Sequence, residues 1–386
     1  AILKAKPAGL PLSDQPAGGS RSAVRDWKDP NTVMVSTVVA PNSLILIVTS
    51  AKSRRAFTVA VSEEVLSRKV GQFRKAITDR GDSGPVSQEL YDLIVGPIKP
   101  QLKALKAKTI VWSLDKFLRY LPIPALKDEK SGYVAQEFAT VIMAQAGRQD
   151  LAISPKGKAQ WRVLAAGVSQ GTADLEALPF VPSELCSIAR EPSQECEGRR
   201  GVIPGTRMLN ARFTYASFTQ AVPNYRVAHI ATHFKFISGT KAEGLGSYLL
   251  LGNGEKLTMD KVRRSNGLFA GIELLTLSAC DTAYGSKTAD GREIEGFGVL
   301  AQKQGARSIM ATLWRVDDES TRDLMVAFYS RYRQAGMTKS EALRHAQVDM
   351  IGVSRNGSKT PFGGAKAAKF SHPYFWAPFI LIGNWR

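Results

Sequence analysis

Long apolar runs are missing from the 386-residue sequence. A membrane-spanning helix needs about 18 or more consecutive apolar residues, whereas the longest apolar stretches, 44–48 and 374–382, have the length of strands. The first residues, AILKAKPAGLPL, contain no hydrophobic segment of the kind found in secretory signals. These absences exclude a membrane helix and give no indication of export, so we expect a cytoplasmic protein without a membrane partner.

Cysteine and histidine are scarce, with three and four residues. Three cysteines do not form a disulfide framework, and an odd number leaves at least one free thiol. Cys186 and Cys196 lack the CxxC spacing, so we interpret them as incidental thiols in a reduced compartment. His229 and His233 are four positions apart, which in a strand is about 13 Å, too far for both to bind one metal ion at roughly 2 Å. We therefore expect no metal site and assign His229 to packing or support.

Acidic residues are outnumbered, because 52 Lys and Arg face 34 Asp and Glu, for a net charge of +18. Such a charge can indicate binding to nucleic acid or another anionic surface. The basic residues are scattered along the chain, however, and aromatic residues do not alternate with them as in proteins that bind single strands. We interpret the charge as a solvated basic surface and do not expect nucleic acid as the primary ligand.

Strand and helix patterns alternate along most of the chain. Residues 1–30 are rich in Pro, Gly and Ser and show no periodicity, which predicts a linker. The alternation from residue 31 onward predicts an α/β fold with a mostly parallel sheet flanked by helices. The polar stretch 147–158 indicates a boundary, so we expect an N-terminal α/β subdomain at 31–155 and a C-terminal subdomain at 156–386.

The hydrophobic patterns predict individual elements and one long loop, 190–206. Strands are expected at 33–39, 43–49, 55–61, 109–112, 162–166, 225–231, 248–251, 272–278, 306–313 and 375–382. Helices are expected near 63–79 and 87–107, within 180–189, at 294–304, around Leu324, Phe328 and Tyr332, and after a capping box at Thr338–Glu341.

Two of the predicted strands end in residues that can carry chemistry. The strand RVAHIA is followed by His233, and the strand IELLTLS is followed by Cys280. Ligands bind at the carboxyl ends of strands in such sheets, so neighbouring strands would bring both side chains to one edge. An imidazole that takes the proton of a thiol makes it a nucleophile. Either residue alone would more simply be structural, but the pair, 47 positions apart, favours a Cys–His dyad.

Four segments make the sequence resemble a known family: VAHIATHF, LSACDTAYG, GARSIMATLWRVDD and HPYFWAPFILIGNW. They are similar to the CHAT domain family, whose members are relatives of caspases and separase, and the resemblance extends over residues 32–386. It implies a caspase-like α/β fold with an inactive, pseudo-peptidase N-terminal subdomain and a catalytic C-terminal one. It also implies a cysteine endopeptidase with His233 as general base and acid, Cys280 as nucleophile, and neither a metal nor an organic cofactor.

The resemblance further implies details of the site. The oxyanion hole would use the backbone N–H groups of Cys280 and of Phe234, at a position where related peptidases usually have Gly. The pocket for the substrate residue before the cut would include the segment ATLWRVDD, which ends in two carboxylates. Asp318 is the first candidate for selecting Arg or Lys, followed by Asp317, with Asp281 next to the nucleophile. Alternatively, Asp317 and Asp318 cap a helix.

Members of this family are often switched on by a sensor or partner protein in death-like or defence pathways. We therefore expect a regulated endopeptidase that cleaves a protein substrate and is activated by an upstream sensor or another protein. Two alternatives remain at this point. One is a catalytically inactive, peptidase-like interaction module, and the other is a basic nucleic-acid-binding module.

Overall fold

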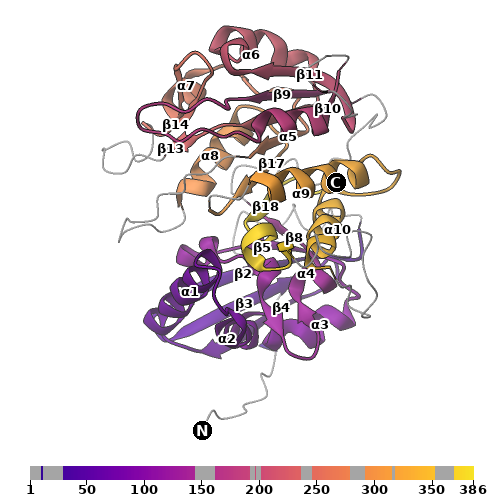
Figure 1. Ribbon diagram of the computed structural model, residues 1–386. Helices are drawn as coiled ribbons and strands as arrows, with labels where there is room; N and C mark the ends of the chain where they lie inside the picture. The colour runs from indigo at the N-terminus through magenta and orange to yellow at the C-terminus, as the bar shows by residue number, and fades with distance from the viewer. Residues whose placement is uncertain are drawn as a thin grey trace. The chain divides into compact units, whose positions relative to one another are not determined.

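The computed structural model of the chain contains two compact units, residues 1–143 and 144–386 (Figure 1). The structure describes residues 10–11, 29–143, 161–191, 196, 201–235, 246–278, 292–314, 318–352 and 369–386. The expected subdomain boundary after residue 155 and most of the expected linker lie outside these ranges. No helix within them is long and apolar enough to cross a membrane.

The N-terminal unit contains a mixed sheet with the strand order β1-β4-β3-β2-β5-β8. Strands β2, β5 and β8 are parallel, and β3, β4 and β1 are added antiparallel. The strands are β1 (Leu10–Pro11), β2 (Thr32–Ala40), β3 (Ser43–Thr49), β4 (Arg54–Ala60), β5 (Thr109–Ser113) and β8 (Ala139–Ile142), and a separate hairpin is formed by β6 (Lys127–Asp128) and β7 (Gly132–Tyr133). Helices are α1 (Glu63–Thr78), α2 (Gly84–Ile94), α3 (Lys99–Ala104) and α4 (Val134–Glu137), with 3₁₀ turns at Gly96–Ile98, Lys116–Tyr120 and Ile123–Ala125.

Alternation and capping explain these elements. In β3, every second side chain is buried, namely Leu44, Leu46 and Val48, as the pleat of a half-covered strand requires. Helix α1 begins after Ser62, whose side chain accepts a hydrogen bond from the Val65 N–H. The expected helix at 87–107 is wrong in its continuity. Gly96 and two prolines, Pro97 and Pro100, divide it into α2, a 3₁₀ turn and α3, because proline lacks the N–H that a helix interior needs.

The C-terminal unit contains the sheet that carries the candidate site, with the strand order β18-β17-β16-β12-β9-β11-β10. All neighbouring pairs are parallel except β17 with β18. The strands are β9 (Val163–Gly167), β10 (Ala189–Arg190), β11 (Ile203–Leu209), β12 (Val227–Ala231), β16 (Leu274–Leu277), β17 (Ser308–Thr312) and β18 (Phe379–Gly383). A small antiparallel sheet is formed by β13 (Phe234–Lys235), β14 (Tyr248–Leu250) and β15 (Lys256–Thr258).

Helices flank this mostly parallel sheet, as the sequence predicts. Every residue of β9, β12, β16 and β17 is buried, which explains their continuous apolar runs. The helices are α5 (Val181–Ile188), α6 (Tyr215–Ala221), α7 (Met259–Arg264), α8 (Arg292–Lys303), α9 (Asp318–Tyr332), α10 (Lys339–Ile351) and α12 (Pro373–Trp376), with 3₁₀ turns at Asn210–Arg212 and Val222–Asn224. The capping box at Thr338 and Glu341 is confirmed at the start of α10.

Two expectations for the C-terminal unit are wrong. The loop expected at 190–206 ends early, because β11 begins at Ile203 and continues through Gly205 alongside β9. Gly205 is required there, since a Cβ atom would lie 2.1 Å from the Val163 carbonyl oxygen. The last strand begins at Phe379 rather than at 375, because Pro373 starts the short helix α12 in front of it.

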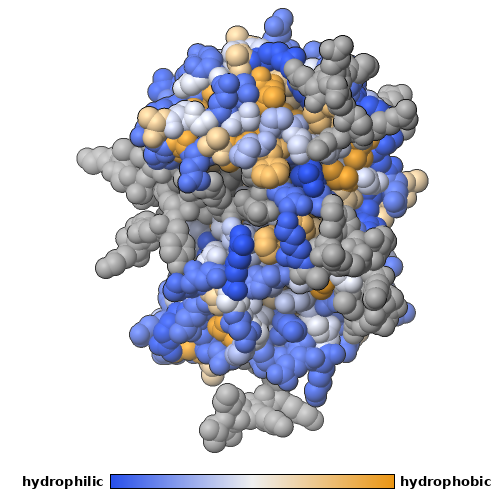
Figure 2. Space-filling model, in the orientation of Figure 1, coloured by the Kyte–Doolittle hydropathy of each residue, from blue (hydrophilic) through white to orange (hydrophobic). Residues whose placement is uncertain are grey.

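Hydrophilic residues predominate on the face shown in Figure 2. Among the described large hydrophobic residues, Val38 and Phe180 are exposed, at 44% and 43%. Phe180 lies directly before α5, at the end of an exposed segment that follows β9.

Candidate active site

The strand order of the C-terminal unit reverses at β9. After β9 the chain forms β10 and β11, which lie on one side of β9, and it then returns to form β12 on the other side. The next strand, β16, lies beyond β12, so the chain leaves β9 and β12 in opposite directions along the sheet. Such a reversal opens a crevice at the carboxyl ends of the two strands, where ligands of open α/β sheets bind. Gly167 ends β9 so close to β12 that a Cβ atom would lie 2.6 Å from the Ala231 carbonyl oxygen. The two strand ends are therefore packed backbone to backbone.

His233 lies at this position, two residues after β12 ends at Ala231. Its backbone carbonyl accepts a hydrogen bond from the Leu250 N–H at 2.9 Å, and the Thr232 hydroxyl donates to the Leu250 carbonyl at 2.7 Å. Its side chain is 9% exposed, and Nε2 lies 2.8 Å from the Glu176 carbonyl oxygen. The segment after β9 thus holds the imidazole from one side, and the small sheet holds its backbone from the other.

The hydrogen bond to Glu176 assigns the imidazole tautomer. A carbonyl oxygen only accepts, so His233 Nε2 carries the proton and donates it. Nδ1 of the neutral ring is then the acceptor nitrogen. The segment that provides the carbonyl is itself fixed, because the Leu178 N–H donates to the Ser169 carbonyl and the Ser169 N–H donates to Asn210 Oδ1 at 2.8 Å. His233 is therefore oriented with a basic nitrogen available for a proton.

Phe234 directs its side chain and its backbone to different neighbours. The ring is 8% exposed and contacts Phe297 of α8 edge to face, with 5.6 Å between ring centroids. Since His233 opposite Leu250 is a hydrogen-bonded pair, the next pair, Phe234 opposite Leu249, is the non-bonded kind in the antiparallel alternation. The Phe234 N–H consequently points away from β14. A backbone donor thus lies beside His233, while the ring is packed into the core.

A buried polar network lies under the same strand ends. The carboxylate of Glu184, from α5, lies 3.0 Å from His229 Nε2 and accepts a hydrogen bond from the Ser278 hydroxyl at 2.8 Å, both through Oε1. His229 Nδ1 lies 3.2 Å from the Tyr329 hydroxyl, which lies 2.8 Å from Thr276 Oγ1. All five side chains are buried. Burial, with the Glu184 charge nearby, raises the pKa of Tyr329 far above its usual value, so its hydroxyl keeps its proton.

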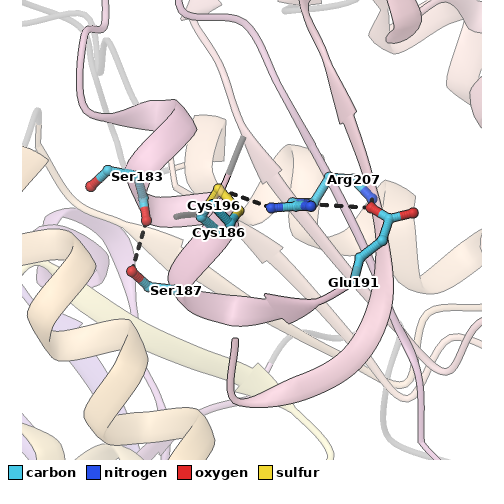
Figure 3. Close-up of a disulfide and its surroundings, with 6 residues drawn as sticks. All are labelled: Ser183, Cys186, Ser187, Glu191, Cys196 and Arg207. Atoms are coloured by element: carbon cyan, nitrogen blue, oxygen red, sulfur yellow. Dashed lines mark hydrogen bonds and ion pairs between the residues drawn. A yellow bond between two sulfur atoms is a disulfide. The ribbon is translucent and has the colours of Figure 1, made fainter. Parts of the chain in front are cut away.

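The interpretation of Cys186 and Cys196 as incidental thiols is wrong, because they form a disulfide (Figure 3). Helix α5 carries Cys186 in its last turn, and the chain returns after β10 so that the two Cα atoms are 5.6 Å apart. Arg207 of β11 donates to Cys186 Sγ at 2.9 Å and forms an ion pair with Glu191, as Figure 3 shows. The sequence did not predict this disulfide, because the two residues lack CxxC spacing and are brought together by the fold.

The remaining expected site residues are not all within the described chain. Cys280, Asp281 and Asp317 lie outside it, and for Asp318 the structure describes only that α9 begins there. β16, which precedes Cys280 in the chain, pairs directly with β12. Among the described residues, no group of three or more His, Cys, Asp or Glu could hold a metal ion. The Glu184 carboxylate and the Glu176 carbonyl were not predicted, since no motif marks either of them.

Comparison with known proteins supports this fold. The family model of the CHAT domain matches residues 84–384. No curated protein sequence matches the chain. The structure of the Saccharomyces cerevisiae separase–securin complex is similar with a TM-score of 0.53 and 8% identity, over 94% of this chain and 30% of that chain. The Arg-specific cysteine proteinase gingipain R of Porphyromonas gingivalis is similar with a TM-score of 0.46 and 9% identity, over 92% of this chain and 78% of that chain.

The likeness to separase establishes the fold, which is caspase-like, and spans less than a third of the separase chain. The segment matched by the family model, residues 84–384, includes His233, Phe234 and β16.

Proposed function

Because the chain belongs to the CHAT domain family, we propose that it is a cysteine endopeptidase that cleaves a protein substrate through Cys280 and His233. One observation carries this proposal. His233 lies at the reversal point of the sheet, and its Nε2–H is bonded to the Glu176 carbonyl, which leaves Nδ1 as a base. The strand that leads into Cys280 is the direct neighbour of the strand that leads into His233.

In the proposed reaction, His233 Nδ1 takes the proton of the Cys280 thiol. The thiolate attacks the carbonyl carbon of the peptide bond and forms a C–S bond, while the carbonyl π electrons move to oxygen. The oxyanion accepts hydrogen bonds from the N–H groups of Phe234 and Cys280, as proposed from the family. The C–N bond then breaks, and the imidazolium gives its proton to the leaving amine. Water, deprotonated by the same nitrogen, hydrolyses the thioester.

The hydrogen bond between His233 and Glu176 supports both halves of this cycle. It fixes the ring plane, so that the proton enters and leaves at the same nitrogen. The carbonyl dipole also stabilises the imidazolium that forms when Nδ1 is protonated. The orientation of the Phe234 N–H away from β14 supports its use as an oxyanion donor.

The residue before the cut is proposed to be Arg or Lys. Asp318 is the first candidate for its carboxylate partner, then Asp317, with Asp281 beside the nucleophile. A charge-assisted hydrogen bond in a partly dry pocket is worth roughly 1.5–3 kcal/mol, or about ten- to a hundredfold in selectivity. A positional peptide library tests this. Preference for Leu or Met that is unchanged in Asp318→Asn would leave the aspartates as helix caps.

We further propose that residues 31–155 form an inactive subdomain and that a sensor or partner protein activates the catalytic one in a death-like or defence pathway. A cytoplasmic location is expected from the sequence, whereas a disulfide of this kind persists in oxidising compartments. Differential alkylation of Cys186 and Cys196 in intact cells decides between a cytoplasmic location and an oxidising compartment. Free thiols would support the cytoplasm, and a protected pair would contradict it.

The test of the proposed activity uses Cys280→Ala and His233→Ala, with His345→Ala as the control histidine in α10. We expect Cys280→Ala to abolish peptide cleavage and His233→Ala to lower kcat by about 10²–10⁴-fold, while circular dichroism shows both to be folded. The control should keep its turnover. Unchanged cleavage in either dyad variant would refute the assignment, and absence of cleavage in the unaltered, activated protein would favour an inactive interaction module.

A further inference from the structure

We propose that Glu184 is a positioning residue that fixes the chain before Cys280 relative to the strand that leads into His233. This inference rests on the proposed dyad and adds a residue that contacts neither substrate nor the reacting atoms. Its basis is a single carboxylate oxygen, Oε1, which joins a helix to the ends of two neighbouring strands.

The contacts join Glu184 to residues that precede Cys280 and His233 in the chain. Ser278, two residues before Cys280 in the chain, donates its hydroxyl to Glu184 Oε1 at 2.8 Å. His229, four residues before His233 on β12, lies 3.0 Å from the same oxygen through Nε2. The side chain of Glu184 itself is only 4% exposed. Bulk solvent therefore has little access to the Glu184 side chain, and both contacts to Oε1 come from buried side chains.

The hydrogen bonds in this network have one consistent direction for a neutral imidazole and a carboxylate. Thr276 donates to the Tyr329 hydroxyl, and Tyr329 donates to His229 Nδ1. His229 Nε2–H then donates to Glu184, which also accepts from Ser278. These four hydrogen bonds can form at the same time, because no atom has to donate the same proton twice. Removal of one member of this buried network leaves its partners with unpaired polar atoms.

Ser278 is fixed by its backbone as well as by its side chain. Its N–H donates to the Ile230 carbonyl of β12 at 2.9 Å, which is the last hydrogen bond between β16 and β12 in the described chain. Two peptide units allow a span of at most about 7.6 Å between the Cα atoms of Ser278 and Cys280. The position of Ser278 therefore limits where the Cys280 thiol can lie. Among the described residues, the hydrogen bond that remains to Ser278 without the Glu184 contact is that of its N–H to the Ile230 carbonyl.

The expected consequence is kinetic. A misplacement of about 1 Å between reacting groups can cost roughly a hundredfold in rate without changing the groups themselves. We therefore expect Glu184→Gln, which keeps the shape but turns the charged acceptor of Ser278 and His229 into a neutral and weaker amide acceptor, to lower kcat by about 10–100-fold. KM should change less than twofold, because the side chain of Glu184 is buried and not available for contact with a substrate.

Glu273→Gln is the matched control. Glu273 is also buried, at 5% exposure, and forms an ion pair with Arg307 at 2.7 Å at the opposite end of β16. This variant thus removes the charge of another buried carboxylate, directly before β16, without altering a member of the network. Ser278→Ala and Ser278→Thr provide a second pair. The Ala variant removes the hydroxyl and should lower kcat as Glu184→Gln does, whereas the Thr variant keeps it and should stay within about threefold of the unaltered protein.

A second measurement needs no substrate. Cys280 is the one cysteine of the three outside the disulfide, so iodoacetamide reports on it alone. We expect the pH profile of its alkylation rate to shift in Glu184→Gln and Ser278→Ala, and to be unchanged in Glu273→Gln and Ser278→Thr. A merely structural role for Glu184 would alter the thermal midpoint without altering this profile.

The outcomes separate the two proposals. If the unaltered protein cleaves peptides but Glu184→Gln matches Glu273→Gln in kcat and in alkylation profile, the positioning role is overturned and the dyad stands. If cleavage does not depend on Cys280, the dyad fails, and the alkylation profile still decides whether Glu184 controls the thiol. A shift restricted to the Glu184 and Ser278→Ala variants supports the positioning role.

Discussion

The ring and the backbone of Phe234 have separate tasks beside His233. The ring packs on Phe297, and the N–H points away from β14, which leaves it available for the oxyanion role that we propose. A side chain at this position thus stabilises the fold, while the donor comes from the main chain and is present in every residue except proline. The glycine that is usual in related peptidases is not required for the hydrogen bond.

We expect Phe234→Ala to lower the free energy of unfolding by about 3–4 kcal/mol, because it removes a buried ring. The kcat of the folded variant should fall no more than about threefold. Phe297→Ala is the matched control, since it removes the other ring of the pair, and a double-mutant cycle should give a coupling of about 0.5–1.5 kcal/mol. A thousandfold loss of kcat at a temperature where the variant is folded would contradict this division of tasks.

Helices α9 and α10 pack on each other, and His345 of α10 is half-buried near charged residues of both helices. Burial, and then the positive charges of Arg344 and Arg331, lower the pKa of His345 below its usual value of 6.5, although Asp349 and Glu341 oppose this. Arg331 also forms an ion pair with Asp349, which joins the two helices. The histidine is therefore a group that the unfolded chain protonates more readily than the folded one.

The lowered pKa of His345 makes the free energy of unfolding depend on pH. Above pH about 7.5 both states hold neutral His345, and as the pH falls through about 6.5 the unfolded state takes up the proton first, so stability is lost. Urea unfolding between pH 7.5 and 5.5 should therefore show a smaller decrease for His345→Gln than for the unaltered protein. An equal decrease in both proteins would show that His345 is not responsible.

Helix α5 is held at its end by the Cys186–Cys196 disulfide. A cross-link that closes a loop of about ten residues stabilises a fold by roughly 2–3 kcal/mol, chiefly through the unfolded state. We expect Cys196→Ala to lower the free energy of unfolding by this amount. A reductant should lower the unaltered protein to the same level and leave the variant unchanged, with Cys280→Ala as the control that remains sensitive to reductant. Insensitivity of the unaltered protein would refute the cross-link.

Elements with a local signal could be predicted from the sequence, and contacts between distant elements could not. The β-branched run 43–49 and the capping box at Thr338 contain their own signals, and both elements lie where they were expected. β11 was hidden because Pro204 and Gly205 indicate a loop, although β11 pairs with β10 on one side and with β9 on the other, and the close approach of β9 requires glycine at position 205. Glu184 could not be predicted, since a single acid in a short helix gains its meaning only from His229 and Ser278 across the sheet.

At the scale of the whole molecule, the net charge of +18 creates a long-range field. At roughly 10 mM salt the screening length is about 30 Å, and at roughly 1 M it is about 3 Å. Peptides with the same cleavage residues but acidic flanks should therefore have a kcat/KM about tenfold higher than peptides with basic flanks at low salt. The difference should vanish near 1 M, whereas uncharged flanks should show little change. A salt-independent ratio would assign the preference to direct contacts.

The order in which the strands are made differs from the order in which they lie in the sheet. β18, which begins at Phe379, pairs with β17, and β17 covers β16, the strand that leads into Cys280. During translation, both residues of the proposed dyad therefore leave the ribosome well before the strand that pairs with β17. A chain that stops before Phe379 carries His233 and Cys280 but lacks the antiparallel partner of β17, so we expect the proposed protease to be inactive until β18 has been made.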